Sequence, residues 1–380
     1  MKRLLRSARR AGLRLAGAAL EGTVRAAAAF APALDAPPRS PGSIFVLRNN
    51  DVGDLLVITP LFAALRRLFP AARIAAGVGN WNLDVLRGNP HLSEVLTVNA
   101  PWFNKYQEEA GTVGRLAYLR SAEVEEIAER RFEIGIDVLG SAWGSLLMLR
   151  AGIPYRLGVR GYAGGHSAVQ AAVRFDPAEH VGRSALRFAE LLGATELPPC
   201  RPQVFLTEEE REEAGRWWAT GGGGRRLVIA PGGGLAAKRW PAESFAALAA
   251  GLADVPRLSV LVLGGPGEEE LAARVAAALP GARAFPEPPG LRRVFALLSH
   301  ADLVVCNSSM PLHAAAAFGK PAVALLGESF PSARLHQAQW GYPGLSRSLG
   351  KEPGERAGVY TPAEALNIVR EEVLRMEPPA

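Results

Sequence analysis

Cysteine is scarce in this chain of 380 residues, and long apolar runs are missing from it. The two cysteines, Cys200 and Cys306, lie far apart and show no metal-ligand spacing. This excludes a disulfide-rich scaffold, argues against a metal site at the cysteines, and fits a reducing, cytoplasmic compartment. Because no stretch reaches the length that a transmembrane helix needs, we expect no membrane-spanning segment.

An excess of charge is also missing from most of the chain. The formal net charge of +6 comes from residues 1–32, where seven basic residues stand against Glu21 alone. The remaining chain is neutral overall, so we expect no nucleic-acid partner. With 48% hydrophobic residues, the chain is long enough to fold as two domains with cores of their own.

The basic N-terminal segment has features of an amphipathic helix. Several leucine and alanine side chains share one face at helical spacing, most cations lie opposite, and Leu20 and Val24 fall outside the apolar face. Such a helix can rest on anionic lipid, so we predict peripheral contact of residues 1–32 with the inner face of the plasma membrane. A disordered basic tail is the alternative.

Short apolar runs alternate with helical patterns from residue 44 onward. We expect strands at 44–47, 73–78, 94–98, 133–138, 227–230, 258–263, 302–306 and 322–326. We expect helices over 55–69, around 113–131, and over 362–376. This alternation predicts an α/β fold of two doubly wound, Rossmann-like domains that face each other across a cleft.

The breaks between these patterns set the expected domain boundaries. A proline-rich stretch lies near 197–202, and four glycines follow at 221–224. We therefore divide the chain into an N-terminal segment and linker (1–42), an N-terminal acceptor-side domain (43–205), a C-terminal nucleotide-sugar donor domain (206–350), and a tail with a closing helix (351–380).

A glycine-rich loop with two cations follows the strand at 227–230. Its sequence is Pro231-Gly-Gly-Gly-Leu-Ala-Ala-Lys-Arg-Trp-Pro241. Glycine lets the backbone approach a ligand, so Gly233 and Gly234 can lie close to a phosphate, while Lys238 and Arg239 supply positive charge. The loop predicts a phosphate cradle at a strand-to-helix junction, with an ordinary surface loop as the alternative.

Three further loops follow strand ends, which is where open α/β sheets bind ligands. Asp54 follows Gly53 where a helix starts, so it is either a helix N-cap or a carboxylate able to accept a proton, and Asp51 is a second candidate. Glu268 follows two glycines and either holds a ribose diol or complements a helix dipole.

The last of these loops runs from Asn307 into a helix that is rich in alanine. Ser308 and Ser309 stand at the helix start, where free N–H groups and hydroxyls form an anion site, or where one serine is a plain N-cap. His313 lies in the first turn, and it either touches a phosphate or packs.

The four loops, in this order and spacing, resemble glycosyltransferase family 9, the ADP-heptose:lipopolysaccharide heptosyltransferase family, which has the two-domain GT-B fold. The resemblance covers about residues 44–345. It rests on a Gly-Asp turn, a Pro-Gly loop ending in Lys-x-Trp-Pro, a Gly-Gly-x-x-Glu turn, and an Asn-x-Ser-x-Pro-x-His loop that is followed by Gly-x-Pro.

The resemblance implies an inverting, metal-independent sugar transfer with no cofactor, from an ADP-sugar to a hydroxyl of a glycan or glycolipid. Asp54 would be the base, and Lys238 would neutralise the leaving diphosphate. The donor would also meet Gly233, Gly234, Arg239, Glu268, Asn307, Ser308, Ser309 and His313.

Two residues depart from the family pattern. Ser308 stands where the family has Asp, and Met310 stands where it has Gly. These departures leave open a weakened or inactive nucleotide-sugar-binding homologue. A GT-B-fold epimerase is a further alternative, with His91, His166 and His180 as its only source of acid/base groups. A dinucleotide-dependent oxidoreductase ranks last, because no Gly-x-Gly-x-x-Gly opens a helix after either first strand.

Overall fold

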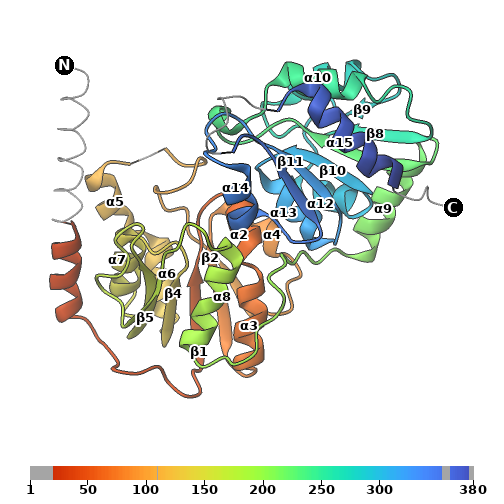
Figure 1. The fold of residues 1–380 in the computed structure, drawn as a ribbon. Helices are drawn as coiled ribbons and strands as arrows, with labels where there is room; N and C mark the ends of the chain where they lie inside the picture. The colour runs from red at the N-terminus through yellow and green to blue at the C-terminus, as the bar shows by residue number, and fades with distance from the viewer. Residues whose placement is uncertain (1–19, 109, 353–359, 376–380) are drawn as a thin grey trace, which may run out of the picture.

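Two six-stranded parallel sheets organise the chain (Figure 1). The computed structural model describes residues 20–108, 110–352 and 360–375. The first sheet has the order β3-β2-β1-β4-β5-β6. Its strands are β1 (Ser43–Leu47), β2 (Arg73–Val78), β3 (Glu94–Thr97), β4 (Ile134–Asp137), β5 (Tyr155–Arg160) and β6 (Ala171–Arg174).

The second sheet repeats this topology with the order β12-β11-β10-β7-β8-β9. Its strands are β7 (Arg225–Ala230), β8 (Leu258–Val262), β9 (Arg283–Ala284), β10 (Leu303–Asn307), β11 (Ala322–Leu325) and β12 (Ser346–Leu349). In each sheet the strand order reverses between the first and fourth strands, which is the doubly wound arrangement. The predicted α/β class with two Rossmann-like sheets is confirmed.

Helices cover both faces of each sheet. The helices of the first half are α2 (Val52–Ile58), α3 (Pro60–Leu68), α4 (Leu83–Leu86), α5 (Thr112–Tyr118), α6 (Ala122–Glu129), α7 (Ala142–Arg150) and α8 (Val181–Leu191). Those of the second half are α9 (Glu208–Ala219), α10 (Ala242–Ala250), α11 (Glu269–Ala277), α12 (Leu291–Ser299), α13 (Met310–Ala317), α14 (Ala333–Trp340) and α15 (Pro362–Arg375). The described residues also include the 3₁₀ turns η1 (Asn80–Asn82) and η2 (Ala236–Lys238).

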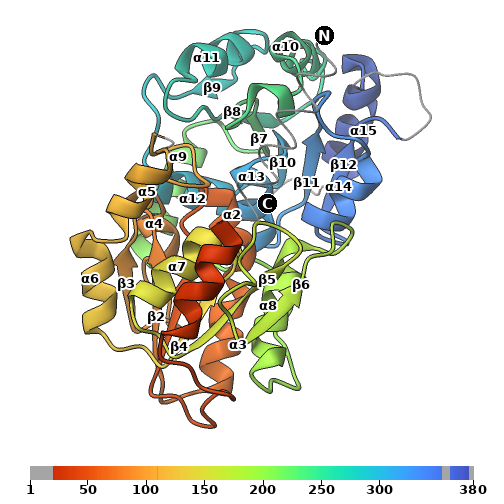
Figure 2. The same ribbon diagram turned by 90° about the vertical axis from the view of Figure 1, so that its left-hand side faces the viewer.

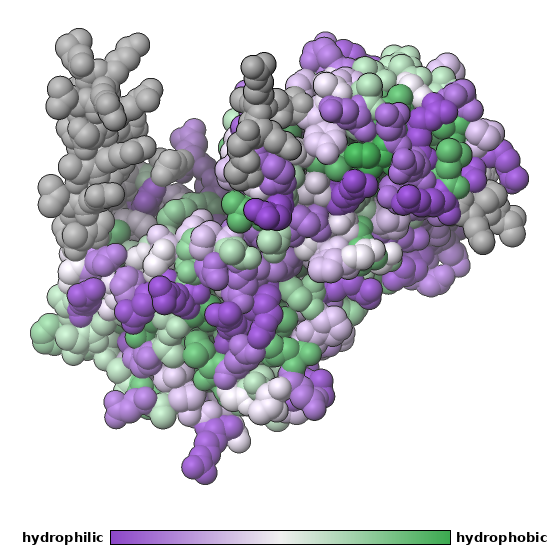
Figure 3. Space-filling model, viewed as in Figure 1, coloured by the Kyte–Doolittle hydropathy of each residue, from purple (hydrophilic) through white to green (hydrophobic). Residues whose placement is uncertain are grey.

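One apolar cluster joins the two halves. It contains the inner residues of both sheets together with buried side chains of α2, α3 and α8 on one side and α12 and α13 on the other. The β-branched and leucine side chains of parallel strands suit this double burial. The carboxyl ends of both sheets are therefore held close to one another, and Figure 3 shows the two lobes as one continuous body on the face viewed.

Two predicted helices are each observed as two helices. The helix expected over 55–69 breaks at Thr59, because Pro60 begins α3 and has no N–H to continue the hydrogen bonds of α2. The helix expected around 113–131 divides into α5 and α6, and the Ser121 side chain caps α6. Four observed strands carry no clear sequence signal, because their apolar runs are short or interrupted by charged residues: β5, β6, β9 and β12.

The N-terminal segment is partly described. Residues 20–29 form a helix that runs beside α7 (Figure 2), and Val24 is buried there against Ala142 and Ala168. The Val24 position outside the predicted apolar face is thus explained by packing on the protein. Residues 1–19, which carry most of the predicted membrane helix, and Met376 at the end of the predicted C-terminal helix lie outside the described residues. No helix in the described part of the chain is long and apolar enough to span a membrane.

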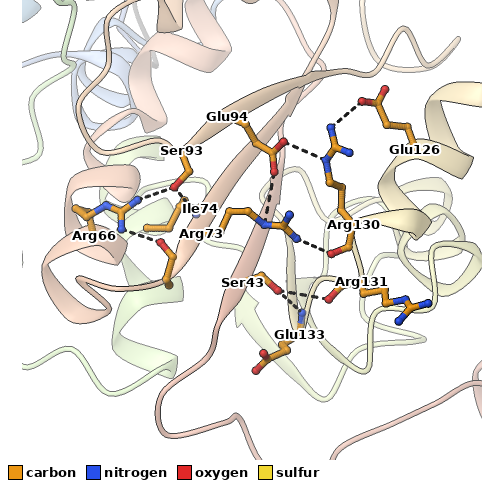
Figure 4. Close-up of polar contacts among 11 residues, drawn as sticks. Ser43, Arg66, Arg73, Ile74, Ser93, Glu94, Glu126, Arg130, Arg131 and Glu133 are labelled. Carbon is orange, nitrogen blue, oxygen red and sulfur yellow. Dashed lines mark hydrogen bonds and ion pairs between the residues drawn. The ribbon is translucent and has the colours of Figure 1, made fainter.

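An arginine–glutamate network fastens the amino ends of the first sheet (Figure 4). Glu94 at the start of β3 pairs with Arg73 of β2 at 3.6 Å and with Arg130 at 3.1 Å. Arg130 also pairs with Glu126 of α6 at 3.1 Å. Because ligands bind beyond the opposite ends of the strands, we assign this network to stability.

Candidate active site

A cavity of about 550 Å³ lies between the two halves at the carboxyl ends of the strands. The first half contributes residues that follow β1, β2 and β3, and the second half contributes the loops after β7, β8 and β10. All four loops singled out in the sequence meet here. The lining includes Asp51, Gly53, Asp54, Trp81, Lys105, Tyr106, Gly232, Gly233, Gly234, Lys238, Gly264, Gly265, Glu268, Ser308, Ser309, Met310, His313 and Trp340.

Asp54 lies in the first turn of α2, and the N-cap residue is Asp51. The structural alternative of Asp54 as a helix cap is therefore wrong. Its Oδ1 accepts a hydrogen bond from Nη2 of Arg48 at 3.3 Å, and its backbone carbonyl accepts one from Nε of the same residue at 3.3 Å. Arg48 is buried, while the Asp54 side chain is 33% exposed. Arg48 thus orients the Asp54 carboxylate, and the carboxylate remains accessible from the cavity.

Asp51 is the second carboxylate at the cavity mouth. Its side chain caps no N–H group of α2, and Oδ1 accepts a hydrogen bond from the backbone N–H of Lys105 at 3.3 Å. Burial and the neighbouring Asp54 raise the pKa of Asp51, against the opposing effect of the Lys105 and Lys238 charges.

The Asn307 side chain fixes the glycine-rich loop after β7 by hydrogen bonds to its backbone. The Asn307 side chain accepts a hydrogen bond from Trp240 N at 2.7 Å and donates to the carbonyls of Pro231 and Gly232 at 2.6 and 2.9 Å. Asn307 is 1% exposed and is not part of the cavity lining. Its position suits shaping the loop, with no direct contact to a ligand.

Glu268 and Arg239 join the loops after β7 and β8. The Glu268 carboxylate accepts hydrogen bonds from Gly233 N at 2.9 Å and Gly265 N at 3.0 Å. Arg239 donates from Nε to the Gly233 carbonyl at 2.8 Å and pairs with Glu268 at 3.2 Å. The Arg239 guanidinium therefore bonds within the protein, whereas the sequence predicts that it supplies positive charge to the donor.

Lys238 ends η2 and lines the cavity with an exposed side chain. Among the described residues, its ammonium has no ion pair and no hydrogen bond, and it lies 5.8 Å from the centre of the Phe330 ring. Of the two cations predicted for this loop, Lys238 is the one whose charge is free for a ligand.

The start of α13 forms the floor of the cavity between these groups. Ser309 is the N-cap residue, and its hydroxyl donates to the Asn307 carbonyl at 3.3 Å without capping an N–H group of the helix. Ser308 hydrogen-bonds to His336 at 2.7 Å. The helix start therefore keeps its positive dipole end toward the cavity.

His313 is a packed, neutral histidine at the cavity edge. It is 5% exposed, and its Nδ1 hydrogen-bonds to the Tyr342 hydroxyl at 2.7 Å. Burial, with smaller effects of His180 and His336, lowers its pKa to about 3. The packing alternative describes this residue, because a neutral ring offers no charge to a phosphate.

Sequence reasoning missed the aromatic and basic residues that the first half brings to the cavity. The rings of Trp81 and Tyr106 stack at 4.8 Å, and the Lys105 ammonium lies 5.2 Å from the Tyr106 ring. Trp81 lies in η1 after β2, and Lys105 and Tyr106 lie in the irregular segment after β3, where no periodic pattern marks a function. None of His91, His166 and His180 lines the cavity, so the epimerase alternative lacks its proposed acid/base groups there.

A group of three or more histidine, cysteine, aspartate or glutamate side chains placed to hold a metal ion is absent from the described residues. The cavity instead presents two ammonium groups, that of Lys238 and that of Lys105 beside the Tyr106 ring.

Comparison with protein families gives one match that covers more than half of the chain. The model of glycosyltransferase family 9 (heptosyltransferase) matches residues 120–334. No curated protein matches the chain.

Solved structures share the fold over nearly the whole chain. A family 9 glycosyltransferase from Veillonella parvula DSM 2008 superposes with a TM-score of 0.71 at 20% identity, covering 90% of this chain and 100% of that one. The E. coli ADP-heptose LPS heptosyltransferase II gives 0.69 at 22% identity, covering 88% and 99%. E. coli heptosyltransferase WaaC, solved with ADP, gives 0.65 at 17% identity, covering 87% and 99%.

Proposed function

Because the chain belongs to glycosyltransferase family 9, and is therefore a heptosyltransferase-like glycosyltransferase of the GT-B fold, we propose that it moves a heptose or related sugar from an ADP-sugar to a hydroxyl acceptor. The transfer inverts the anomeric carbon, needs no metal, and serves the assembly of lipopolysaccharide or another cell-surface glycan. One observation carries the proposal: the Asp54 carboxylate and the free Lys238 ammonium, from opposite halves, line one cavity.

On the donor side, Lys238 and the start of α13 receive the diphosphate. An ammonium and a helix N-terminus both stabilise the negative charge that builds up as the sugar leaves. Glu268 takes the ribose, because a carboxylate has about four acceptor positions and its contacts to Gly233 N, Gly265 N and Arg239 leave one of them for a hydroxyl. Asn307 and Arg239 position the loop.

On the acceptor side, Asp54 removes the proton from the acceptor hydroxyl as the oxygen attacks the anomeric carbon. The bond from that carbon to the diphosphate oxygen breaks on the opposite face, and the proton ends on Asp54. Arg48 donates a hydrogen bond to one oxygen of the Asp54 carboxylate, which leaves the other oxygen to accept the proton. Asp51 is the alternative base, since it lines the same cavity.

We also propose that the acceptor is lipid-linked and that residues 1–32 bring the enzyme to an anionic membrane at the cytoplasmic face. The seven basic residues of this segment support the proposal. Because residues 20–29 pack on α7, we assign the proposed membrane contact to the residues that precede them.

Calorimetric titration with ADP, UDP and GDP and with their sugars tests the donor proposal. We expect ADP and an ADP-sugar to bind more tightly than their UDP and GDP counterparts. Tight binding with no sugar transfer to any acceptor, including a lipid extract, would instead favour a binding-only homologue, for which Ser308 and Met310 are the motivating residues.

A further inference from the structure

We propose that Ser308 recognises the donor sugar as a hydrogen-bond acceptor only, because a relay through His336, Ser348 and Gln337 fixes the direction of its hydroxyl proton. The inference rests on the proposed function and adds to it the chemistry of the sugar contact. Ser308 lines the same cavity as Lys238, and the Lys238 charge acts on its partner His336, so a sugar attached to a diphosphate at Lys238 lies within reach of Ser308.

The relay starts from a backbone carbonyl, which can only accept. Gln337 Nε2 donates to the Ser346 carbonyl at 3.0 Å, which leaves the Gln337 Oε1 as the acceptor for its other neighbour. Ser348 Oγ donates to that oxygen at 2.8 Å. Since a hydroxyl has one hydrogen, Ser348 has none left for His336.

The next two bonds follow by elimination. His336 Nδ1 lies 2.7 Å from Ser348 Oγ, and this bond forms only if Nδ1 carries the hydrogen. A neutral ring with its hydrogen on Nδ1 has a bare Nε2, which accepts. Ser308 Oγ, 2.7 Å from Nε2, is therefore the donor of the last bond. Its lone pairs remain for a ligand.

The surroundings keep His336 in the neutral form that this relay needs. The ring is 2% exposed and lies edge-on to Phe330 at 4.9 Å. The charged or titratable groups facing it in the described part of the chain are Lys238 and the neutral His313. Burial and the Lys238 charge lower the pKa of His336 to about 4, so the ring is neutral at pH 7.

This geometry offers a neutral acceptor at the position where the family has a carboxylate. A sugar hydroxyl that points at Ser308 donates to it, whereas a group that can only accept, such as a carbonyl or a fluorine, finds no partner. Ser308 thus selects for a donor sugar with a free hydroxyl at this position.

Nitrogen-detected histidine spectra test the relay without any enzymatic activity. The chain has six histidines, and the His336→Gln variant assigns the His336 signals. We expect the Nδ1–H tautomer from pH 8 to pH 5. We expect Ser348→Ala to bring in the Nε2–H tautomer, because Nδ1 loses its acceptor, and Ser299→Ala, whose hydroxyl lies outside the cavity lining, to change nothing. A charged ring or an Nε2–H tautomer at pH 7 in the unaltered protein would overturn the inference.

Titration with ADP and with ADP-heptose tests the role of Ser308. We expect Ser308→Ala to weaken ADP-heptose binding about 3- to 10-fold, the size of one hydrogen bond, and to leave ADP binding within about twofold. If Ser308→Ala leaves ADP-heptose binding unchanged, or weakens the binding of both ligands equally, the role of Ser308 is wrong while the proposed function stands. If the unaltered protein binds neither ligand, the proposed function fails, and the role of Ser308 fails with it.

Discussion

Lys238 and Arg239 are neighbours in sequence, but their charges are used differently. Arg239 is bonded to the Gly233 carbonyl and to Glu268, and Lys238 has no such partner in the described structure. A chain pattern of two cations predicts a phosphate site, yet it does not tell which cation is free. That distinction depends on Glu268, which comes from another strand end.

Replacing Lys238 tests its proposed contact with the diphosphate. We expect Lys238→Met to weaken ADP binding about 10- to 100-fold, the range of a hydrogen bond or ion pair to a charged group in a partly closed site. Lys320→Met removes the same charge outside the cavity lining and serves as the control. Calorimetry measures the ADP affinity of both variants. Equal affinities would show that Lys238 does not contact the diphosphate.

The buried histidines make a prediction about acid stability. The pKa values of His336 and His313 are lowered from the ordinary 6.5 to about 4 and about 3. Between pH 6.5 and 4 the unfolded chain binds protons that the folded chain does not, so stability falls as the pH falls. Each ring contributes a loss of about 2 kcal/mol between pH 7 and 5.

Asp137 acts in the opposite direction. Its burial raises the pKa to about 6, so the folded chain binds this proton first and gains stability as the pH falls below 6. The free energy of unfolding, measured in urea at pH 7, 6 and 5, therefore contains the sum of these opposing effects. We expect His336→Gln to reduce the slope of this free energy against pH by the equivalent of about one proton. An unchanged slope would show that His336 titrates normally in the folded protein.

At the scale of elements, the loop after β7 depends on a glycine that has no room for a side chain. A Cβ on Gly232 would lie 1.8 Å from Glu268 Oε2, whereas a Cβ on Gly233 meets atoms only at 3.8 Å and beyond. We expect Gly232→Ala to displace Glu268 and destabilise the protein by about 1–3 kcal/mol, and Gly233→Ala to leave the Tm nearly unchanged. Equal Tm values for both variants would contradict the described loop.

The helix of residues 20–29 allows a second test at this scale. Val24 is fully buried against Ala142 and Ala168, and Ala26 is exposed on the same helix. We expect Val24→Asp to detach the helix from α7, since an unpaired carboxylate is costly to bury, and Ala26→Asp to have little effect. Limited proteolysis measures the release, and similar cleavage of both variants would count against this packing.

The sequence predicts most elements because hydrophobic periodicity is strong in β1, β2, β7, β8, β10 and β11. It misses β5, which carries Arg156 as its second residue, because the buried guanidinium is satisfied by the carbonyls of Ile153, Ala168 and Pro32, contacts that only the fold supplies. The break at Thr59 was readable in principle, since Pro60 follows it directly.

At the scale of the whole molecule, the site exists because two helix starts meet. A Cβ on Gly53 would lie 3.2 Å from His313 Cδ2 and 3.6 Å from Met310 N, so the first turn of α2 lies against the first turn of α13. This contact brings Asp54 of the first half and Lys238 of the second half to the lining of one cavity. The motif order in the sequence predicts the meeting of the loops, but it does not predict Trp81, Lys105 and Tyr106.

The rate of ADP release from ADP-heptose, in the presence of a lipid-linked acceptor extract, tests the central claim most directly. We predict that Asp54→Asn lowers kcat about 10²- to 10⁴-fold, the contribution of a general base, while ADP binds as before. Asp84→Asn, which also changes a carboxylate in the first turn of a helix paired with an arginine, should retain the rate. An Asp54→Asn enzyme with an unchanged rate, or a loss seen only with Asp51→Asn, would contradict the assignment of Asp54 as the base.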